Sequence, residues 1–210
     1  MTIPPPPRLR GALHLATLPV AVLAGLVLVL AADGGRARIG AAVYALGLAG
    51  MLTASAVYHR ARLTEAARRV ARKVDHAMIF VLIAATGTPF ALLVLEPPVS
   101  IALLAITWGG ALVGVVLTVG WPGSPRWVRA LAYLTVGWAG VAAFPALASV
   151  SGGALALLVA GGVLYTLGAL VYAAGRPDPL PRVFGFHEVF HTFVVAAAAL
   201  HFAAVGVVVA

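Results

Sequence analysis

The sequence predicts an all-α integral membrane protein, a bundle of seven transmembrane helices. Of its 210 residues, 62% are hydrophobic and only 10% are charged, whereas a soluble domain carries about 25% charged residues. The hydrophobic residues also gather into separate stretches, each near the roughly 20 residues that a helix needs to cross a bilayer. These stretches cover approximately 11–32, 40–59, 74–95, 98–120, 127–149, 153–174 and 184–209.

The first of these stretches follows a proline-rich, basic lead-in, MTIPPPPRLR. A secretory signal peptide has a shorter apolar region of about 7–15 residues and a small-residue cleavage site. The stretch 11–32 is longer than that, so we expect a helix that is retained. The predicted organisation is therefore a short cytoplasmic tail, residues 1–10, and a single transmembrane domain, residues 11–210.

The segments between the remaining stretches have the composition of membrane loops. They contain Gly/Pro turns or charged residues, which punctuate helices, and the shortest, EPP, separates the third stretch from the fourth. In order they are DGGRAR, RARLTEAARRVARK, EPP, WPGSPR, SGG and GRPDPLPR.

The basic residues predict the orientation of the bundle. If the N-terminus is cytoplasmic, twelve of the fourteen Lys and Arg residues lie inside, and only Arg36 and Arg38 lie outside. This asymmetry is the positive-inside pattern, so we expect a cytoplasmic N-terminus and an external C-terminus. The formal net charge of +8 then reflects topology, and we expect no nucleic-acid partner.

Several ionisable residues lie within or at the ends of the predicted helices, where they are costly and usually functional. Ser55 and His59 are four residues apart in TASAVYHR, hence on one helical face. Asp75 opens the third helix, and His187 and His191 open the seventh. The topology brings these helix ends to the same side of the membrane, so the side chains should share one depth near the cytoplasmic face.

The chain has no cysteine, so a metal must be bound by nitrogen or oxygen ligands. His187 and His191 lie in HEVFH, which fits the H-E-x-x-H pattern of metalloproteases. With His59 as a third imidazole, the set leaves an open position, as in catalytic zinc sites. Asp75 would then hold or deprotonate the water that Zn²⁺ activates, with Ser55 as a further hydrogen-bond partner.

The other histidines are expected outside this site. His76 lies about 100° around its helix from Asp75 and should pack or face the interface. His14 and His201 are predicted to be off the site. His201 is about 15 Å along the helix from His191 and should bond a neighbouring helix. For each histidine taken singly, a packing role is the simpler interpretation, and the metal hypothesis depends on the set.

Four segments resemble the hemolysin III–type membrane proteins, bacterial relatives of the progestin and adiponectin receptors. They are SAVYH, DHAMIF, FHEVFHTFVVAAAALHF and the opening RGALHLATLPVAVLAG. The resemblance implies a seven-helix bundle of the bacterial plasma membrane with zinc near its cytoplasmic side. It also implies that His59, His187 and His191 are the ligands, and that Ser55 and Asp75 contact the metal-bound water.

The wider superfamily includes ceramide-cleaving amidases, so the resemblance suggests a zinc-dependent hydrolase of a lipid amide or ester, with a membrane lipid as substrate or ligand. The alternative is a membrane-homeostasis or sensor protein with structural zinc. No polar stripe runs through all the helices, which disfavours a pore or cytolysin. A retinal protein is disfavoured because the one lysine, Lys73, lies at a helix edge.

An intramembrane protease would use Glu188 as its base, but the residues after His191 offer no acidic third ligand. We therefore expect Glu188→Gln to retain zinc and function, whereas His187→Ala or His191→Ala should lose the metal.

Overall fold

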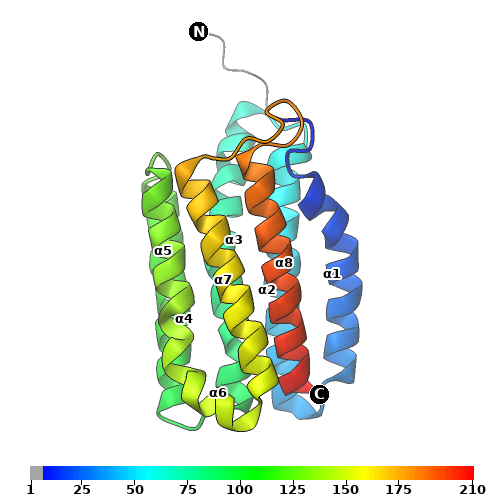
Figure 1. The fold of residues 1–210 in the computed structure, drawn as a ribbon, viewed down its shortest axis with the longest axis vertical. Coiled ribbons are helices and arrows are strands. Elements are labelled where there is room, and N and C mark those ends of the chain that lie inside the picture. Colours follow the sequence, from blue (N-terminus) through cyan, green and yellow to red (C-terminus); the bar gives the residue numbers. More distant parts are fainter. Residues whose placement is uncertain (1–6) are drawn as a thin grey trace.

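The protein is an all-α bundle of long helices that run side by side, as a computed structural model shows (Figure 1). The structure describes residues 7–210, apart from the side chains of 142–144 and 149–150. The predicted tail, residues 1–10, thus lies largely outside the described residues. The helices are α1 (Ala12–Ala31), α2 (Gly34–Arg60), α3 (Glu65–Leu93), α4 (Val99–Gly120), α5 (Arg126–Trp138), the 3₁₀ helix η1 (Ala139–Ala143), α6 (Phe144–Val150), α7 (Gly152–Ala174) and α8 (Phe186–Val209).

Six helices in the described part of the chain are long and apolar enough to cross a membrane: α1, α2, α3, α4, α7 and α8. The fifth predicted span is present but broken into α5, η1 and α6. Gly137, Gly140 and Pro145 lie within this segment, and glycine and proline are the residues that a helix interior tolerates least. The six spans and the broken segment together form the predicted seven-helix bundle.

The start of α3 differs from the prediction. Most of RARLTEAARRVARK was expected to be a loop, but the helix begins at Glu65. Thr64 caps it by accepting a hydrogen bond from the Ala67 amide, and the following Ala and Arg residues are strong helix formers. The charged residues were expected to end the helical region, but α3 continues through them, beyond the apolar residues that would cross the membrane. Asp75 therefore lies in the third turn of α3.

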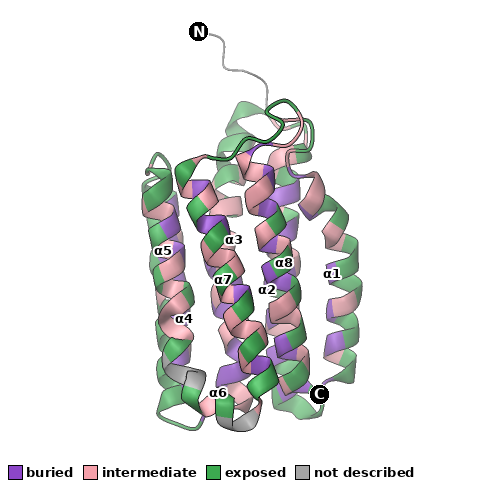
Figure 2. Ribbon diagram, in the orientation of Figure 1, coloured by how far each residue is buried: buried purple, intermediate pink, exposed green. Residues whose placement is uncertain are grey.

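The helices pack through small residues, and their outer faces are apolar. A Cβ on Gly47 would lie 2.6 Å from the Ala85 Cβ, so α2 and α3 approach closely there. Buried residues face the interior of the bundle (Figure 2). On α1 the outward side chains include Leu23 and Leu30, which are 65% and 70% exposed. An apolar outer face of this kind is suited to lipid.

One end of the bundle carries the loops that follow α2, α4 and α7, together with the N-terminal segment (Figure 1). There the amides of Arg8 and Leu9 donate hydrogen bonds of 3.1 Å to the carbonyls of Arg182 and Val183. The segment before α1 is thereby fixed to the α7–α8 connection. The C-terminal end of α2 and the N-terminal end of α8 lie at this same end, which sets the place of the candidate site.

Candidate metal centre

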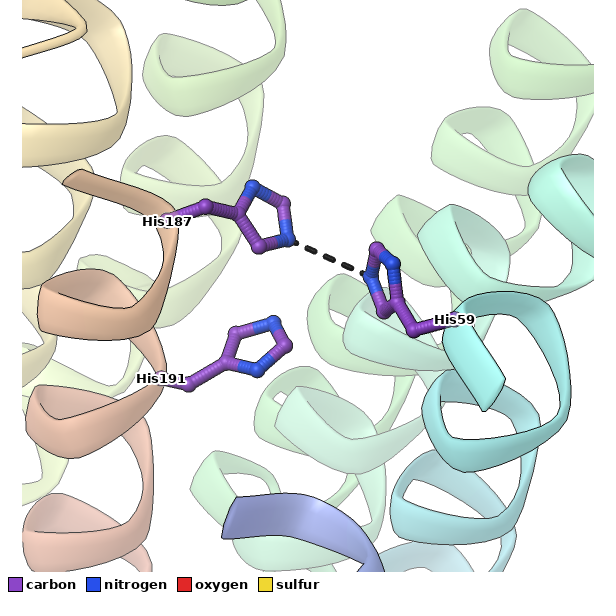
Figure 3. Close-up of side chains that lie close together, drawn as sticks. All are labelled: His59, His187 and His191. Atoms are coloured by element: carbon purple, nitrogen blue, oxygen red, sulfur yellow. Dashed lines mark hydrogen bonds between the residues drawn. The ribbon is translucent and has the colours of Figure 1, made fainter. Parts of the chain in front are cut away.

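Three imidazoles converge between α2 and α8 (Figure 3). His59 projects from the last turn of α2, while His187 and His191 lie one turn apart on α8. One ring nitrogen of each lies within 4.8 Å of the others, and the Nε2 atoms of His59 and His187 are 3.2 Å apart. Two nitrogens bound tetrahedrally to Zn²⁺ at 2.0–2.1 Å are about 3.3 Å apart. The predicted trio is therefore brought together at a spacing that suits one metal ion.

The donor set also fits zinc. Imidazole is a ligand that zinc binds well, and the three converging donors are all imidazole nitrogens. His191 is 3% exposed, so it contributes a desolvated donor from the bundle interior. Two further groups contact this trio closely enough to influence it, Asp75 and His14.

Asp75 projects from α3 toward the centre, as the sequence predicted. Its Oδ2 atom lies 4.0 Å from the His59 Nε2 and 3.7 Å from the His76 Nδ1. The Asp75 carboxylate therefore lies beside the candidate ligand nitrogen of His59 without a hydrogen bond to it. His76 itself packs on its own helix, with Nδ1 2.7 Å from the Arg72 carbonyl, in agreement with the expected packing role.

The expectation that His14 lies off the site was wrong. Its ring stacks on that of His191, with centroids 3.8 Å apart and planes at 11°. Its Nδ1 is 2.8 Å from the Ser55 hydroxyl oxygen, so Ser55, 2% exposed, bonds to His14. One feature of the sequence could have indicated this position. His14 lies near the start of the first predicted span, at the end of the bundle that also carries the three imidazoles. His201 bonds the Leu158 carbonyl of α7 at 3.1 Å, as expected.

Glu188 faces away from the trio, although it is part of HEVFH. One carboxylate oxygen accepts the Gly185 amide at 2.8 Å, which caps the start of α8. The other forms an ion pair with Arg10. Both oxygens are thus engaged at the helix end, an arrangement that does not suit the base of a peptidase.

A cavity of about 200 Å³ adjoins the centre inside the bundle. Its polar end is formed by His14, Ser55, Asp75 and His187, and the remaining lining is mostly apolar. The cavity follows α3 as far as Phe90, fifteen residues and so about 22 Å beyond Asp75. The arrangement is a long, mostly apolar space that reaches His187 and His191, two of the three imidazoles.

A family model described as haemolysin-III related matches residues 5–202. The chain belongs to this family. The resemblance drawn from the short motifs is thereby confirmed, and this haemolysin-III protein has named relatives in Bacillus. It is 35% identical over 132 residues to Hemolysin-3 of Bacillus cereus, an alignment covering 61% of this chain and 57% of the relative.

The Hemolysin-3 homolog of Bacillus subtilis (strain 168) is 35% identical over 130 residues, covering 61% of this chain and 58% of that protein. The matches therefore span less than three fifths of the length of both relatives. No solved structure matches this haemolysin-III protein significantly.

Proposed function

We propose that this haemolysin-III family protein is a zinc-dependent hydrolase of a lipid amide or ester in the bacterial plasma membrane. One observation carries the proposal: His187 and His191, two of three convergent imidazoles, line the polar end of a mostly apolar cavity of about 200 Å³ within a membrane bundle. A polar reactive end and a long apolar body match a lipid, whose scissile bond joins a polar group to a hydrocarbon chain.

His59, His187 and His191 would hold the metal. Zinc bound by three imidazoles supplies a Lewis acid and an activated water at neutral pH. Asp75, 4.0 Å from the His59 Nε2, is the proposed acceptor of the proton from that water. A carboxylate in hydrogen-bonding reach of the reacting group is a suitable general base.

The cavity would receive the hydrocarbon chain. Side chains such as Ile79, Ile83 and Val194 line it and exclude water, so burial of the chain there is favourable. Because the space runs about 22 Å along α3, a chain lying in it would place its carbonyl end beside His187 and Asp75. The substrate class proposed is therefore a lipid with one long chain and an amide or ester link.

We further propose that the centre lies near the inner leaflet, with residues 1–10 as a cytoplasmic tail of a single transmembrane domain, residues 11–210. Twelve of the fourteen basic residues support this orientation. The chain has no cysteine, so a single introduced thiol reports its side. Arg62→Cys should be labelled only after the membrane is permeabilised, and Arg36→Cys in intact cells; the reverse pattern would invert the topology.

The experiment that tests the activity is a measurement of bound zinc in purified protein, followed by assays on ceramide and other lipid amides and esters. Asp75→Ala should keep zinc and lose turnover, while Asp33→Ala, at an exposed position at the other end of the bundle, should keep both. Zinc-loaded protein that turns over no lipid of a broad panel would contradict the hydrolase.

The alternative function, membrane homeostasis with structural zinc, predicts a different result. Asp75→Ala would then leave both the zinc content and the cellular phenotype unchanged, because no water needs to be deprotonated.

A further inference from the structure

A second, smaller pocket lies where the start of α3 meets the connection between α4 and α5. Three cationic side chains line it, Arg72 and Lys73 from α3 and Arg129 from α5. Its wall also contains the hydroxyl groups of Thr118 and Ser124, and none of its lining residues is acidic. The pocket therefore offers cations and hydrogen-bond donors without a carboxylate.

The three cations have no counter-charge from the protein. In the part of the chain that the structure describes, the ion pairs of Arg and Lys side chains are those of Arg10 with Glu188 and of Arg69 with Glu65. Like charges gathered around one pocket repel each other. An anion bound among them would therefore be stabilised.

Neutral groups hold Arg129 in place. Its Nε and Nη2 donate hydrogen bonds of 3.1 and 2.9 Å to the Tyr172 hydroxyl, and its Nη1 donates to the hydroxyl and the carbonyl of Ser124. A guanidinium group has five N–H donors, so at least one, on Nη2, has no acceptor among the described residues. Arg72 is held similarly, because its Nη2 donates to the Pro122 carbonyl at 3.0 Å. Both guanidinium groups are thus positioned while their charges remain uncompensated.

The size and the place of the pocket indicate which anion it suits. Its volume is about 10 Å³, close to the space that one water molecule needs, so one oxygen of a ligand can enter while the rest stays outside. Trp121, which lines the pocket, and Trp127 are 53% and 62% exposed. Exposed tryptophans at the ends of membrane helices lie at the level of the lipid headgroups, where basic pockets between helices bind the phosphate of anionic lipids.

We propose that Arg72, Lys73 and Arg129 bind the phosphate of an anionic membrane phospholipid. Its acyl chains would lie along the outer face of α4, where Leu117 and Val113, one and two turns before Trp121, are 52% and 59% exposed. The site does not include the three imidazoles, and the proposal does not depend on bound zinc.

The test is the affinity of purified protein in detergent for phosphatidylglycerol, measured by native mass spectrometry. Each cation at a membrane surface contributes about fivefold, so Arg72→Gln/Lys73→Gln should bind about 30-fold more weakly. The matched control is Arg62→Gln/Arg68→Gln, which removes the same charge from exposed positions outside the pocket and should keep most of the affinity. Equal losses in the two double variants would show that binding follows net charge alone and would overturn the site.

Two other probes identify the ligand. Phosphatidylcholine, whose phosphate carries its own cation, should bind more weakly than phosphatidylglycerol, and equal affinity would contradict recognition of an anionic headgroup. Inorganic phosphate should compete poorly, and a phosphate ion that binds as tightly as the lipid would overturn the lipid assignment. If the double variant does not fold, Lys73→Gln decides, because Lys73 forms no hydrogen bond among the described residues. About fivefold weaker binding is then expected, and unchanged binding would refute the site.

Discussion

The turn that leads into α1 packs against His59, a candidate metal ligand. A methyl group added at Gly11 in this turn should therefore disturb both the turn and the position of His59. Gly11 has a φ of 72°, and a Cβ built on it would lie 2.4 Å from the Cβ of His59. Gly11→Ala therefore meets two penalties, a left-handed backbone conformation that alanine disfavours and an overlap with the first atom of the His59 side chain, which no rotamer change relieves.

The two penalties can be given magnitudes and separated. The left-handed conformation costs roughly 1–2 kcal/mol for a residue with a Cβ, and overpacking adds about 1–3 kcal/mol, so Gly11→Ala should cost about 2–5 kcal/mol in all. Gly34 has a φ of 83° with nothing within 4 Å of its Cβ position. Gly34→Ala should therefore show the first penalty alone. Gly35→Ala, with neither feature, should cost nothing.

Thermal unfolding in detergent and zinc affinity are the measurements. At about 2–4 °C per kcal/mol for a chain of this size, Gly11→Ala should melt roughly 4–20 °C below the wild type and Gly34→Ala roughly 2–8 °C below. Only Gly11→Ala should also bind zinc more weakly, since it displaces His59. If the Gly11→Ala protein melts at the same temperature as the Gly34→Ala protein and binds zinc with wild-type affinity, the predicted overlap with His59 is refuted.

Three further predictions concern the centre. Glu188→Gln should keep zinc but melt at a lower temperature, because it removes the ion pair with Arg10. The amide oxygen of the glutamine can still accept the hydrogen bond from the Gly185 amide. Loss of zinc in this variant would instead place Glu188 in the metal centre. His187→Ala or His191→Ala should abolish stoichiometric zinc binding, measured by metal analysis, and full zinc content in either would contradict the ligand set. Zinc affinity should fall at acidic pH, where protons begin to compete for the three imidazoles, and a chelator-competition profile that stays flat until the protein unfolds would count against histidine ligation.

The sequence predicts most membrane-spanning helices well, because the hydropathy of each stretch alone indicates whether that stretch can cross a membrane. The ends of α4 and α7 lie within one residue of the expected ones. The errors arise where a second effect competes. Charge indicated a loop before Val74, but helix propensity and the Thr64 cap extend α3 there. Around Gly140, hydropathy indicated one continuous span, but backbone effects break it.

The same distinction explains the candidate site. His187 and His191 are found from spacing on one helix, and topology alone brings His59 and Asp75 to their level. The stacking of His14 on His191 could not be predicted, because it depends on how far α1 is rotated about its axis where it packs against α2 and α8. That rotation is set by many side-chain contacts and leaves no periodic signal in an α1 that is apolar on all sides.

HEVFH illustrates how one motif can combine two unrelated causes. Helix α8 begins at Phe186, so Glu188 is its third residue, where a carboxylate caps the backbone and is favoured by the helix dipole. The two histidines, four apart, face the bundle interior because the helix repeats every 3.6 residues. Glu188 lies about 100° around the helix from His187 and about 60° from His191, and its carboxylate pairs with Arg10. The resemblance to the peptidase pattern therefore arises from a candidate metal-binding pair on the first turns of a helix and from a residue that caps the start of that helix. The acid proposed for the centre, Asp75, comes from another helix.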